Sequence, residues 1–302
     1  MLISKKNMPD CYHIYTHNDL DGAVSLLAFM WSKPKGTSFQ YTSITNMGID
    51  KLKRDIANSH DLANIYVLDL GLREEFLPDL DQPNITIIDH HKSSEKFVER
   101  FKHAKIIYKE YTSNALLTYR LFKDTINASK EQKTLIALAD DFDCNRLALP
   151  DSYDLNILFW NYFQSDFAGF VKYYYDGFKP ITDHQRKAIN HIKREAAIEA
   201  EKVPLYSGTI NFGGKEKLVY AGMMEKSAPQ VMEILMNKYK PDIFFSINPK
   251  SEKVSIRQRN PENPTDLGKF AEKFLNGGGH PNAAAGVITP LFMELTKNLK
   301  PI

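Results

Sequence analysis

Short apolar runs alternate with longer amphipathic segments through the first half of the chain, and this pattern predicts strands separated by helices. The predicted strands, rich in β-branched and aromatic residues, are residues 12–16, 65–70, 85–88 and 104–108. The predicted helices are residues 22–31, 50–58, 95–101, 114–122 and 129–139, the last with Ser129 as its N-cap. Because strands alternate with helices, we expect an α/β fold with a doubly wound, mostly parallel sheet.

The second half of the chain has a different pattern. Residues 151–203 are first rich in aromatic side chains and then charged with a helical period, and composition favours a core role for the aromatics over a dimer interface or a base-stacking platform. Further strands are predicted at residues 218–223, 243–247 and 254–257, with helices at residues 229–239 and 267–275. We therefore expect two domains with an active-site cleft between them. The predicted parts are a catalytic α/β domain at residues 1–185, a helical connector at 186–204 and a smaller α/β domain at 205–302.

Composition and charge narrow the class of protein. The chain has 302 residues, a formal net charge of +2 and 43% hydrophobic residues, which is typical of a globular protein with a real core. The near-neutral charge does not demand a polyanionic partner, although it leaves room for a local basic site. The sequence has no apolar run of membrane-spanning length and no apolar leader. With two cysteines and no CxxC, it predicts a reducing, cytoplasmic location and no membrane partner.

Residues with metal-ligating side chains follow three of the predicted strands. The first strand runs into THNDLDG, the second contains LDLG and the third ends in IDHH. The side chains concerned are those of His17, Asp19, Asp21, Asp69, Asp89, His90 and His91. In open parallel sheets functional sites form at the carboxyl ends of the strands, so we expect these side chains to meet there.

The chemistry of this set predicts a pair of divalent cations. Carboxylate and imidazole without thiolate suit Mn²⁺ or Mg²⁺ better than a structural zinc. So many candidate ligands suit two ions about 4 Å apart, an arrangement that favours in-line displacement at phosphorus. Asp69 stands alone on its strand and is the candidate for the bridging carboxylate.

A fourth group of acids ends the predicted helix that contains LIALADDFD. Asp140, Asp141 and Asp143 lie at its C-terminus, where negative charge is unfavourable for the helix dipole. A cation is the simplest compensation, so this segment is expected to contribute to the same site.

The stretch NGGGHPNAAAG, residues 276–286, has almost no side chains apart from His280 and Asn282. We interpret it as a loop whose backbone N–H groups approach an anion closely. Just upstream, Arg257 and Arg259 alternate on a predicted strand and share a face, where guanidinium groups could hold a phosphate or stack on a base.

Taken together, these segments resemble the DHH phosphoesterase superfamily, and the resemblance extends over nearly the whole chain. THNDLDG, VLDLG, IDHH and ALADD are similar to its four N-terminal motifs, and VSIRQR with GGGHPNAAAG is similar to the DHH-associated C-terminal domain. The compact first motif, with His17 and Asp19 two residues apart, is similar to the nano-RNase branch.

The resemblance implies a role for each matching residue. Asp89 would orient an imidazole and His91 would face the scissile phosphate, while Asp141 is the rival of Asp140 for the fourth motif. The implied metal ligands are His17, Asp19, Asp21, Asp69, His90 and Asp140. The implied substrate-binding residues are Arg257, Gly277, Gly278, Gly279 and His280.

The function implied by the resemblance is two-metal hydrolysis of phosphodiesters, with Mn²⁺ as the expected cofactor and Mg²⁺ or Co²⁺ as substitutes. A small substrate-holding domain on a nearly neutral chain favours short single-stranded oligonucleotides, released as nucleoside 5′-monophosphates. Alternatives within the same chemistry are a cyclic (di)nucleotide phosphodiesterase and a 3′-phosphoadenosine 5′-phosphate phosphatase. A non-catalytic nucleotide-binding module is the alternative outside it. A homodimer is compatible with the sequence.

Overall fold

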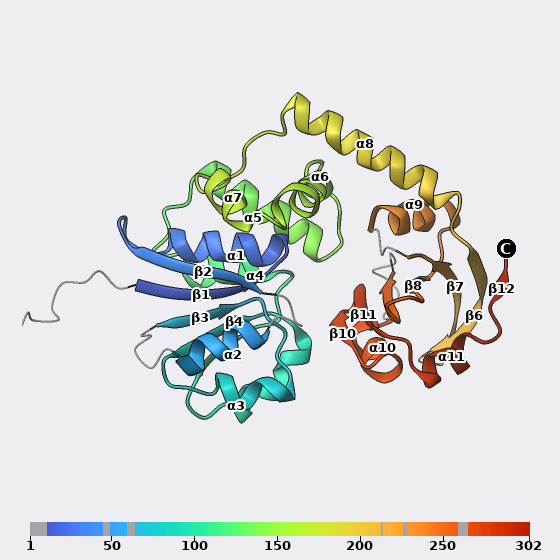
Figure 1. The fold of residues 1–302 in the computed structure, drawn as a ribbon, viewed down its shortest axis with the longest axis horizontal. Helices are drawn as coiled ribbons and strands as arrows, with labels where there is room; N and C mark the ends of the chain where they lie inside the picture. Colours follow the sequence, from blue (N-terminus) through green and yellow to red (C-terminus); the bar gives the residue numbers. More distant parts are fainter. Residues whose placement is uncertain (1–10, 45–48, 59–63, 213, 226–228, 259–264) are drawn as a thin grey trace, which may run out of the picture. The chain divides into compact units, whose positions relative to one another are not determined.

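The computed structural model describes residues 11–44, 49–58, 64–212, 214–225, 229–258 and 265–302. The chain divides into two compact units, Met1–Ile181 and Thr182–Ile302 (Figure 1). Each unit has its own sheet and its own clusters of buried apolar side chains, so each has the core of a separate α/β domain. Among the helices of these described ranges, none is long and apolar enough to cross a membrane.

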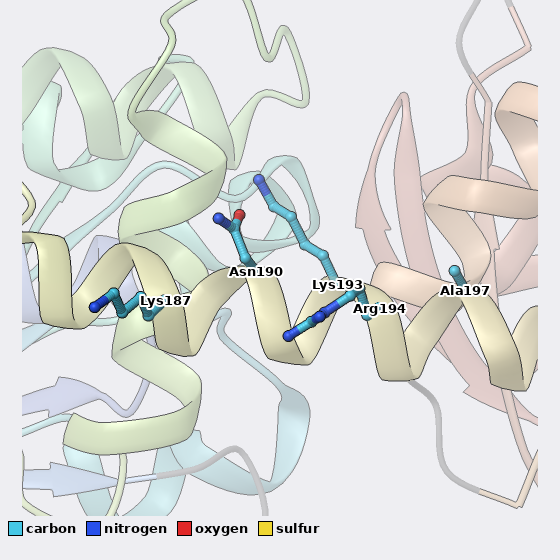
Figure 2. A pocket seen from close by; sticks show the side chains of 5 residues that line it. All are labelled: Lys187, Asn190, Lys193, Arg194 and Ala197. Carbon is cyan, nitrogen blue, oxygen red and sulfur yellow. The ribbon is translucent and has the colours of Figure 1, made fainter.

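The second unit begins with a long helix, α8 (Asp183–Ala200). Thr182 caps it, and Gln185 completes a capping box, which explains why the helix begins there. This helix covers most of the segment that we expected to be a connector. Lys187, Asn190, Lys193 and Arg194 line an open surface hollow of about 600 Å³ along it (Figure 2). Its lining residues include no carboxylate, so the hollow is unrelated to the predicted metal chemistry.

The sheet of the first unit is entirely parallel, with strand order β2-β1-β3-β4-β5 across the described residues. Its strands are β1 (Cys11–His17), β2 (Ser38–Ile44), β3 (Ile65–Leu68), β4 (Ile85–Asp89) and β5 (Lys105–Tyr108). The sequence pattern did not reveal β2, because this edge strand, SFQYTSI, is too polar to give a buried-strand signal. The order places the topological switch point between β1 and β3, where α/β proteins bind their ligands.

Helices cover both faces of this sheet, as a doubly wound fold requires (Figure 1). One face carries α1 (Leu20–Trp31), α4 (Asn114–Leu121), α5 (Lys130–Asp143), α6 (Ser152–Leu158), a π-helical turn (Phe159–Phe163) and α7 (Phe167–Tyr173). The other carries α2 (Ile49–Asn58), a 3₁₀ turn (Glu74–Phe76), α3 (Leu77–Leu80) and the 3₁₀ segment η2 (Lys92–Arg100).

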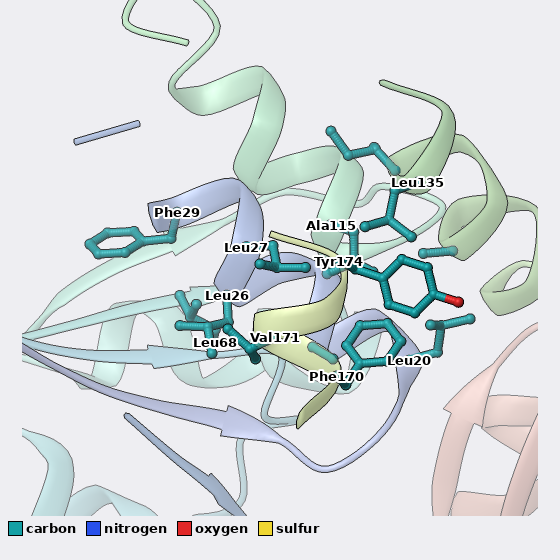
Figure 3. Packing of buried hydrophobic residues seen from close by; sticks show 14 of the residues in the cluster. Leu20, Leu26, Leu27, Phe29, Leu68, Ala115, Leu135, Phe170, Val171 and Tyr174 are labelled. Atoms are coloured by element: carbon teal, nitrogen blue, oxygen red, sulfur yellow. The ribbon is translucent and has the colours of Figure 1, made fainter. Parts of the chain in front are cut away.

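The aromatic middle segment belongs mainly to the core of the first face. Phe159, Phe170 and Tyr174 are buried there, and Figure 3 shows Phe170 and Tyr174 among the side chains of α1 and α5. Truncation of such a buried Phe costs about 3–5 kcal/mol of stability. The core role expected from composition is therefore confirmed for these residues, whereas Trp160 and Tyr162 remain 41% and 49% exposed.

The segment after β4 differs from the helix that we expected at residues 95–101. It forms the 3₁₀ segment η2 instead, which begins immediately after His91. Ser94 explains the tight winding, because its hydroxyl donates to the Asp89 carboxylate and accepts from the backbone N–H of Leu72 at 2.7 Å. The Ser94 backbone N–H also donates to the His91 carbonyl at 2.9 Å, so this stretch is held close to the end of β4.

The second unit contains a mixed sheet with strand order β10-β11-β9-β8-β7-β6-β12 among the described residues. Its strands are β6 (Leu205–Phe212), β7 (Lys215–Met223), β8 (Ile243–Asn248), β9 (Lys253–Arg257), β10 (Gly278–His280), β11 (Ala283–Val287) and β12 (Lys300–Pro301). Its further helices are α9 (Pro229–Tyr239), α10 (Leu267–Phe274) and α11 (Pro290–Thr296).

The glycine-rich stretch that we expected to be a loop is a β-hairpin of β10 and β11. The glycines allow the backbones to approach one another closely. A Cβ at Gly277 would lie 1.9 Å from the Ala285 carbonyl oxygen, and one at Gly279 would lie 2.5 Å from the Ala284 Cα. Gly279 also has a φ of +147°, which other residues rarely adopt. The loop interpretation was therefore wrong, because the absence of side chains serves tight packing.

At the C-terminal end of α1, four aromatic rings surround the Lys33 ammonium. Its Nζ lies 4.5 Å from the ring centroid of Phe29, 4.9 Å from those of Tyr12 and Phe122, and 5.7 Å from that of Tyr66. Burial lowers the Lys33 pKa, so the rings and the negative end of the helix dipole must supply the interactions that water would otherwise give.

We expect Lys33→Met, which keeps the aliphatic stem and removes the charge, to lower the free energy of unfolding by about 1 kcal/mol. Lys33→Arg should retain most of the stability, because a guanidinium also interacts with aromatic faces. Urea denaturation monitored by tryptophan fluorescence measures this difference. The matched control is Lys35→Met at an exposed position two residues away, and an equal loss in both Met variants would contradict the cation–π explanation.

Candidate metal centre

The predicted ligands of the first unit converge on one edge of the parallel sheet. His17 is the last residue of β1, Asp69 directly follows β3 and Asp89 ends β4. The register pairs Thr16 with Leu68 and Leu68 with Ile88, so the residue after each pair lies in the same row. The strand ends therefore place the three side chains at the switch point of the sheet.

His90 lies at the centre of this cluster, with its side chain 1% exposed. Its Nδ1 is 3.1 Å from the Tyr111 carbonyl oxygen, so the N–H of Nδ1 donates there and Nε2 is the nitrogen that faces the carboxylates. Nε2 lies 3.4 Å from Asp69 Oδ1, 3.6 Å from Asp21 Oδ2 and 3.7 Å from Asp143 Oδ2. Burial lowers the pKa of this imidazole, but the charges of Asp143 and Asp21 outweigh burial and raise it.

The Asp69 carboxylate is the most unusual group of the cluster. It is buried, and within the described part of the chain its Oδ1 has no hydrogen-bond donor. Its backbone has a φ of 58°, a left-handed conformation that is uncommon outside glycine. Burial, together with the charges of Asp21 and Asp19, raises the pKa of Asp69 well above its usual value. A buried carboxylate oxygen without a donor is costly unless a cation compensates it.

The donor set fits divalent cations. Two groups of side chains each bring three ligand atoms within 4.8 Å of one another: His17 with Asp19 and Asp69, and Asp21 with His90 and Asp143. Their oxygen and imidazole donors suit Mn²⁺ or Mg²⁺. The two groups adjoin through Asp69 and His90, which are 3.4 Å apart, so these residues could hold two neighbouring ions.

Helix α1 orients two members of these groups. Asp19 is its N-cap, accepting from the Gly22 backbone N–H at 2.8 Å with one oxygen and contacting His17 Nδ1 at 2.7 Å with the other. Asp21 lies in the first turn and is buried. Burial raises the pKa of Asp21. Burial would also raise the pKa of Asp19, but the charge and hydrogen bond of His17 outweigh it and lower that pKa to about 2.

Asp89 and His91 form a hydrogen-bonded pair that adjoins the cluster, with His91 Nδ1 3.9 Å from Asp69 Oδ1. His91 Nδ1 lies 2.8 Å from Asp89 Oδ1, and the other Asp89 oxygen accepts from the Ser94 hydroxyl. Asp89 is fully buried; burial would raise its pKa, but the charge and hydrogen bond of His91 lower it. One Asp89 oxygen thus orients the His91 ring and the other orients the Ser94 hydroxyl. The His91 ring is 22% exposed, and its Nε2 points away from Asp89.

The end of α5 separates its three acids into different environments. Asp140 accepts from Arg146 Nη2 at 2.6 Å and from the Thr112 hydroxyl. Asp141 accepts from the backbone of the following turn and from Ser152 Oγ at 2.6 Å. The compensation that we expected for these two acids is therefore supplied by the protein itself.

Asp143 is the acid of α5 that faces His90, at 3.7 Å from Nε2. Burial and the charge of Asp21 raise its pKa well above the usual value. The sequence places Asp143 among the three acids at the end of this helix, but it does not single out Asp143 as a ligand. The only sequence signal is its spacing of three residues from Asp140, which places both on one helix face. The role of Asp140 as a ligand stays a prediction.

In the second unit, the sheet register aligns two of the predicted substrate-binding residues. His280 on β10 pairs with Ala283 on β11, which pairs with Arg257 on β9. Directly paired residues share a face of the sheet, so the imidazole and the guanidinium flank a small Ala283 side chain. Arg259 lies outside the described residues.

Titration of the buried metal-site groups predicts that the metal-free protein loses stability as the pH rises. The pKa values of Asp21, Asp69 and Asp143 are raised, so these carboxyls retain protons in the folded chain that the unfolded chain has already released. The raised pKa values of His17 and His90 act with the same sign. Stability therefore falls as the pH increases from about 4 through the raised folded values.

We expect the Tm of the protein in EDTA to fall between about pH 5 and pH 8. Asp69→Asn should raise this Tm at about pH 7.5 and weaken its pH dependence, because it removes a group that must either carry a buried, repelled charge or take up a proton on folding. Calorimetry measures both effects. Asp81→Asn is the contrasting control, since Asp81 accepts from three backbone N–H groups and its loss should lower the Tm. A wild-type Tm that rises over this range would contradict the assignment.

Comparison with known proteins identifies the second unit and the fold. Residues 207–300 match the DHHA1 domain. Similar structures include the pGpG-specific phosphodiesterase PggH from Vibrio cholerae (12% identity, 95% of this chain and 96% of that one, TM-score 0.52) and an exopolyphosphatase-related protein from Bacteroides fragilis (15% identity, 95% and 89%, TM-score 0.51).

A third similar structure is RecJ in complex with Mn²⁺ from Thermus thermophilus, with 11% identity and a TM-score of 0.53. The alignment covers 97% of this chain and 53% of RecJ. A comparison with curated protein sequences finds none that matches. The expected resemblance is thus confirmed at the level of the fold, whereas the nano-RNase branch stays a prediction. Residues 207–300 therefore match a DHHA1 domain, and the chain as a whole shares its fold with these three structures.

Proposed function

We propose that this protein is a phosphoesterase dependent on two divalent cations that hydrolyses short oligonucleotides to nucleoside 5′-monophosphates. The observation that carries the proposal is the buried Asp69 carboxylate, which lacks a donor on Oδ1 within the described chain and lies where the two groups of candidate ligands adjoin. A protein that only binds nucleotides has no need of such a costly arrangement.

The proposed centre uses His17, Asp19, Asp21, Asp69, His90 and an acid of α5 as ligands. Divalent cations held there supply Lewis acidity, which makes water more acidic and stabilises charge on phosphoryl oxygens. Asp69 is the proposed bridge, because its two oxygens face different histidines, with Oδ1 3.4 Å from His90 Nε2 and Oδ2 4.0 Å from His17 Nδ1. Asp143 is favoured for α5, since Asp140 already pairs with Arg146.

His91 is proposed to contact the scissile phosphate. Asp89 holds its Nδ1 at 2.8 Å and so fixes the orientation in which the ring would meet a phosphoryl oxygen. The ring is more exposed than that of His90, which suits contact with a substrate. Asp89 itself acts by fixing the orientation of the ring, because it is fully buried.

The row of His280 and Arg257 in the DHHA1 domain is proposed to hold another part of the substrate. A guanidinium and an imidazole on one face suit a phosphate, and the small residues between them leave room for it. Gly278 is distinct from its neighbours, because a Cβ there would meet nothing within 4 Å. Its lack of a side chain has no packing reason and suits close approach by a ligand.

The proposed substrate class follows from charge and from the similar structures. A net charge of +2 gives the chain no general excess of positive charge for binding a long polyanionic strand. Among the similar structures, the Vibrio cholerae protein is named for a dinucleotide, pGpG, and the Thermus thermophilus protein was solved with Mn²⁺. We therefore favour short oligonucleotides and Mn²⁺.

The first test is a panel of substrates with Mn²⁺: labelled dinucleotides, short RNA and DNA oligomers, cyclic dinucleotides and 3′-phosphoadenosine 5′-phosphate. We expect the linear dinucleotides and short oligomers to yield nucleoside 5′-monophosphates. Asp69→Asn should reduce the rate by more than the roughly 10–100-fold typical of a lost group that only orients a ligand.

The matched control is Asp124→Asn, which removes an exposed carboxylate and should leave the rate unchanged. Cleavage of only the cyclic or the 3′-phosphorylated substrates would replace the proposed substrate with one of those alternatives. Binding without cleavage of any member would favour a non-catalytic module.

The second test is Gly278→Ala, which the hairpin can accept because open space surrounds that position. If the substrate approaches this backbone, KM should rise by roughly tenfold, equivalent to about 1.4 kcal/mol of lost binding, with the Tm unchanged. Gly277→Ala is the structural comparison and should lower the Tm, since its Cβ would collide with the Ala285 carbonyl. An unchanged KM in Gly278→Ala would remove the hairpin from the substrate site.

A further inference from the structure

Asn114, the first residue of α4, contacts the metal centre although no sequence motif singled it out. It is completely buried and follows the N-cap Ser113. Its backbone N–H donates to Asp21 Oδ2 at 2.7 Å, and the N–H of Ala115 donates to the other oxygen at 2.8 Å. The N-terminus of α4 therefore holds both oxygens of the Asp21 carboxylate and favours its negative charge.

The Asn114 side chain joins three further elements. With its amide oxygen facing Ser25 Oγ at 3.1 Å and the Asp69 N–H at 3.2 Å, its NH₂ group donates to the Ile88 carbonyl at 3.2 Å. In this orientation each contact pairs a donor with an acceptor. One amide thus connects α1, the end of β3 and the end of β4.

The contact between the Asn114 side chain and the Asp69 N–H helps to hold the left-handed backbone conformation of Asp69. A left-handed residue other than glycine costs about 1–2 kcal/mol, so its surroundings must hold it there. The Asp69 N–H donates to the Ile88 carbonyl at 3.0 Å, and the Asn114 oxygen is its second acceptor. Asn114 therefore constrains the backbone from which the candidate bridging carboxylate projects.

We propose that Asn114 is a positioning residue of the metal centre, which orients Asp21 through the N-terminus of α4 and Asp69 through its amide side chain. Its own polar atoms are engaged by Ser25, Asp69 and Ile88, so it acts through the ligands and is not one itself. This inference rests on the proposed metal centre and adds a residue that sets its affinity for cations.

The test measures Mn²⁺ binding by calorimetry and the Mn²⁺-induced rise in Tm for the full chain. We expect Asn114→Ala to weaken Mn²⁺ binding by at least about tenfold and to reduce the Tm rise accordingly. Asn114→Asp should weaken it further, because a carboxylate oxygen would then face the Ile88 carbonyl. Ser25→Ala removes only one partner of the amide and should weaken binding by a smaller factor.

The matched control is Asn156→Ala, which deletes an equally buried amide on α6 outside the candidate ligand groups. It should lower the Tm without metal while leaving the Mn²⁺ affinity unchanged. Near wild-type Mn²⁺ affinity in Asn114→Ala and Ser25→Ala would overturn the positioning role, and so would an equal loss in Asn156→Ala. If the wild type itself binds no Mn²⁺, the proposed metal centre fails rather than the assignment of Asn114 within it.

Discussion

Mutual repulsion among buried carboxylates is the constraint on which the first unit depends. Asp21, Asp69 and Asp143 are held around one imidazole, His90, and burial together with their shared charge raises the pKa of all three. The fold tolerates this cluster only because large apolar clusters cover both faces of the sheet behind it. Cations held among these carboxylates would reduce the repulsion, whereas without them the cluster lowers the stability of the folded chain.

The surrounding groups control where that charge remains uncompensated. Arg146 and the turn after α5 compensate Asp140 and Asp141, and Ser94 with His91 occupies Asp89. Within the described residues, Asp69 Oδ1 in the interior of the cluster is left without a hydrogen-bond donor. This division separates residues that orient from residues available as ligands, and Asn114 extends the orienting set to the backbone of Asp69.

The second unit contains no comparable cluster of carboxylates among its described residues, and its candidate substrate-binding residues lie on a sheet instead. Its mixed sheet presents His280 and Arg257 in a row, while tightly packed glycines hold β10 against β11 and α10. This arrangement provides a sheet edge with little steric bulk and fixed polar groups.

The sequence by itself determined the α/β class, the core role of the aromatic segment and the strand ends where acids and imidazoles gather, because hydrophobic period and strand-end polarity are local signals. It did not reveal the edge strand β2, which is too polar to give a buried-strand signal, or the 3₁₀ segment after His91, where Ser94 contacts Leu72 far along the chain. It did not reveal the glycine hairpin either, because glycine and alanine give no strand period. Only the tertiary structure decided which acid of α5 faces His90 and that Asn114 contacts both Asp21 and Asp69. The reason is physical: a carboxylate's role is set by the donors that reach it, and Arg146, Ser152 and Asn114 reach theirs only after the chain has folded.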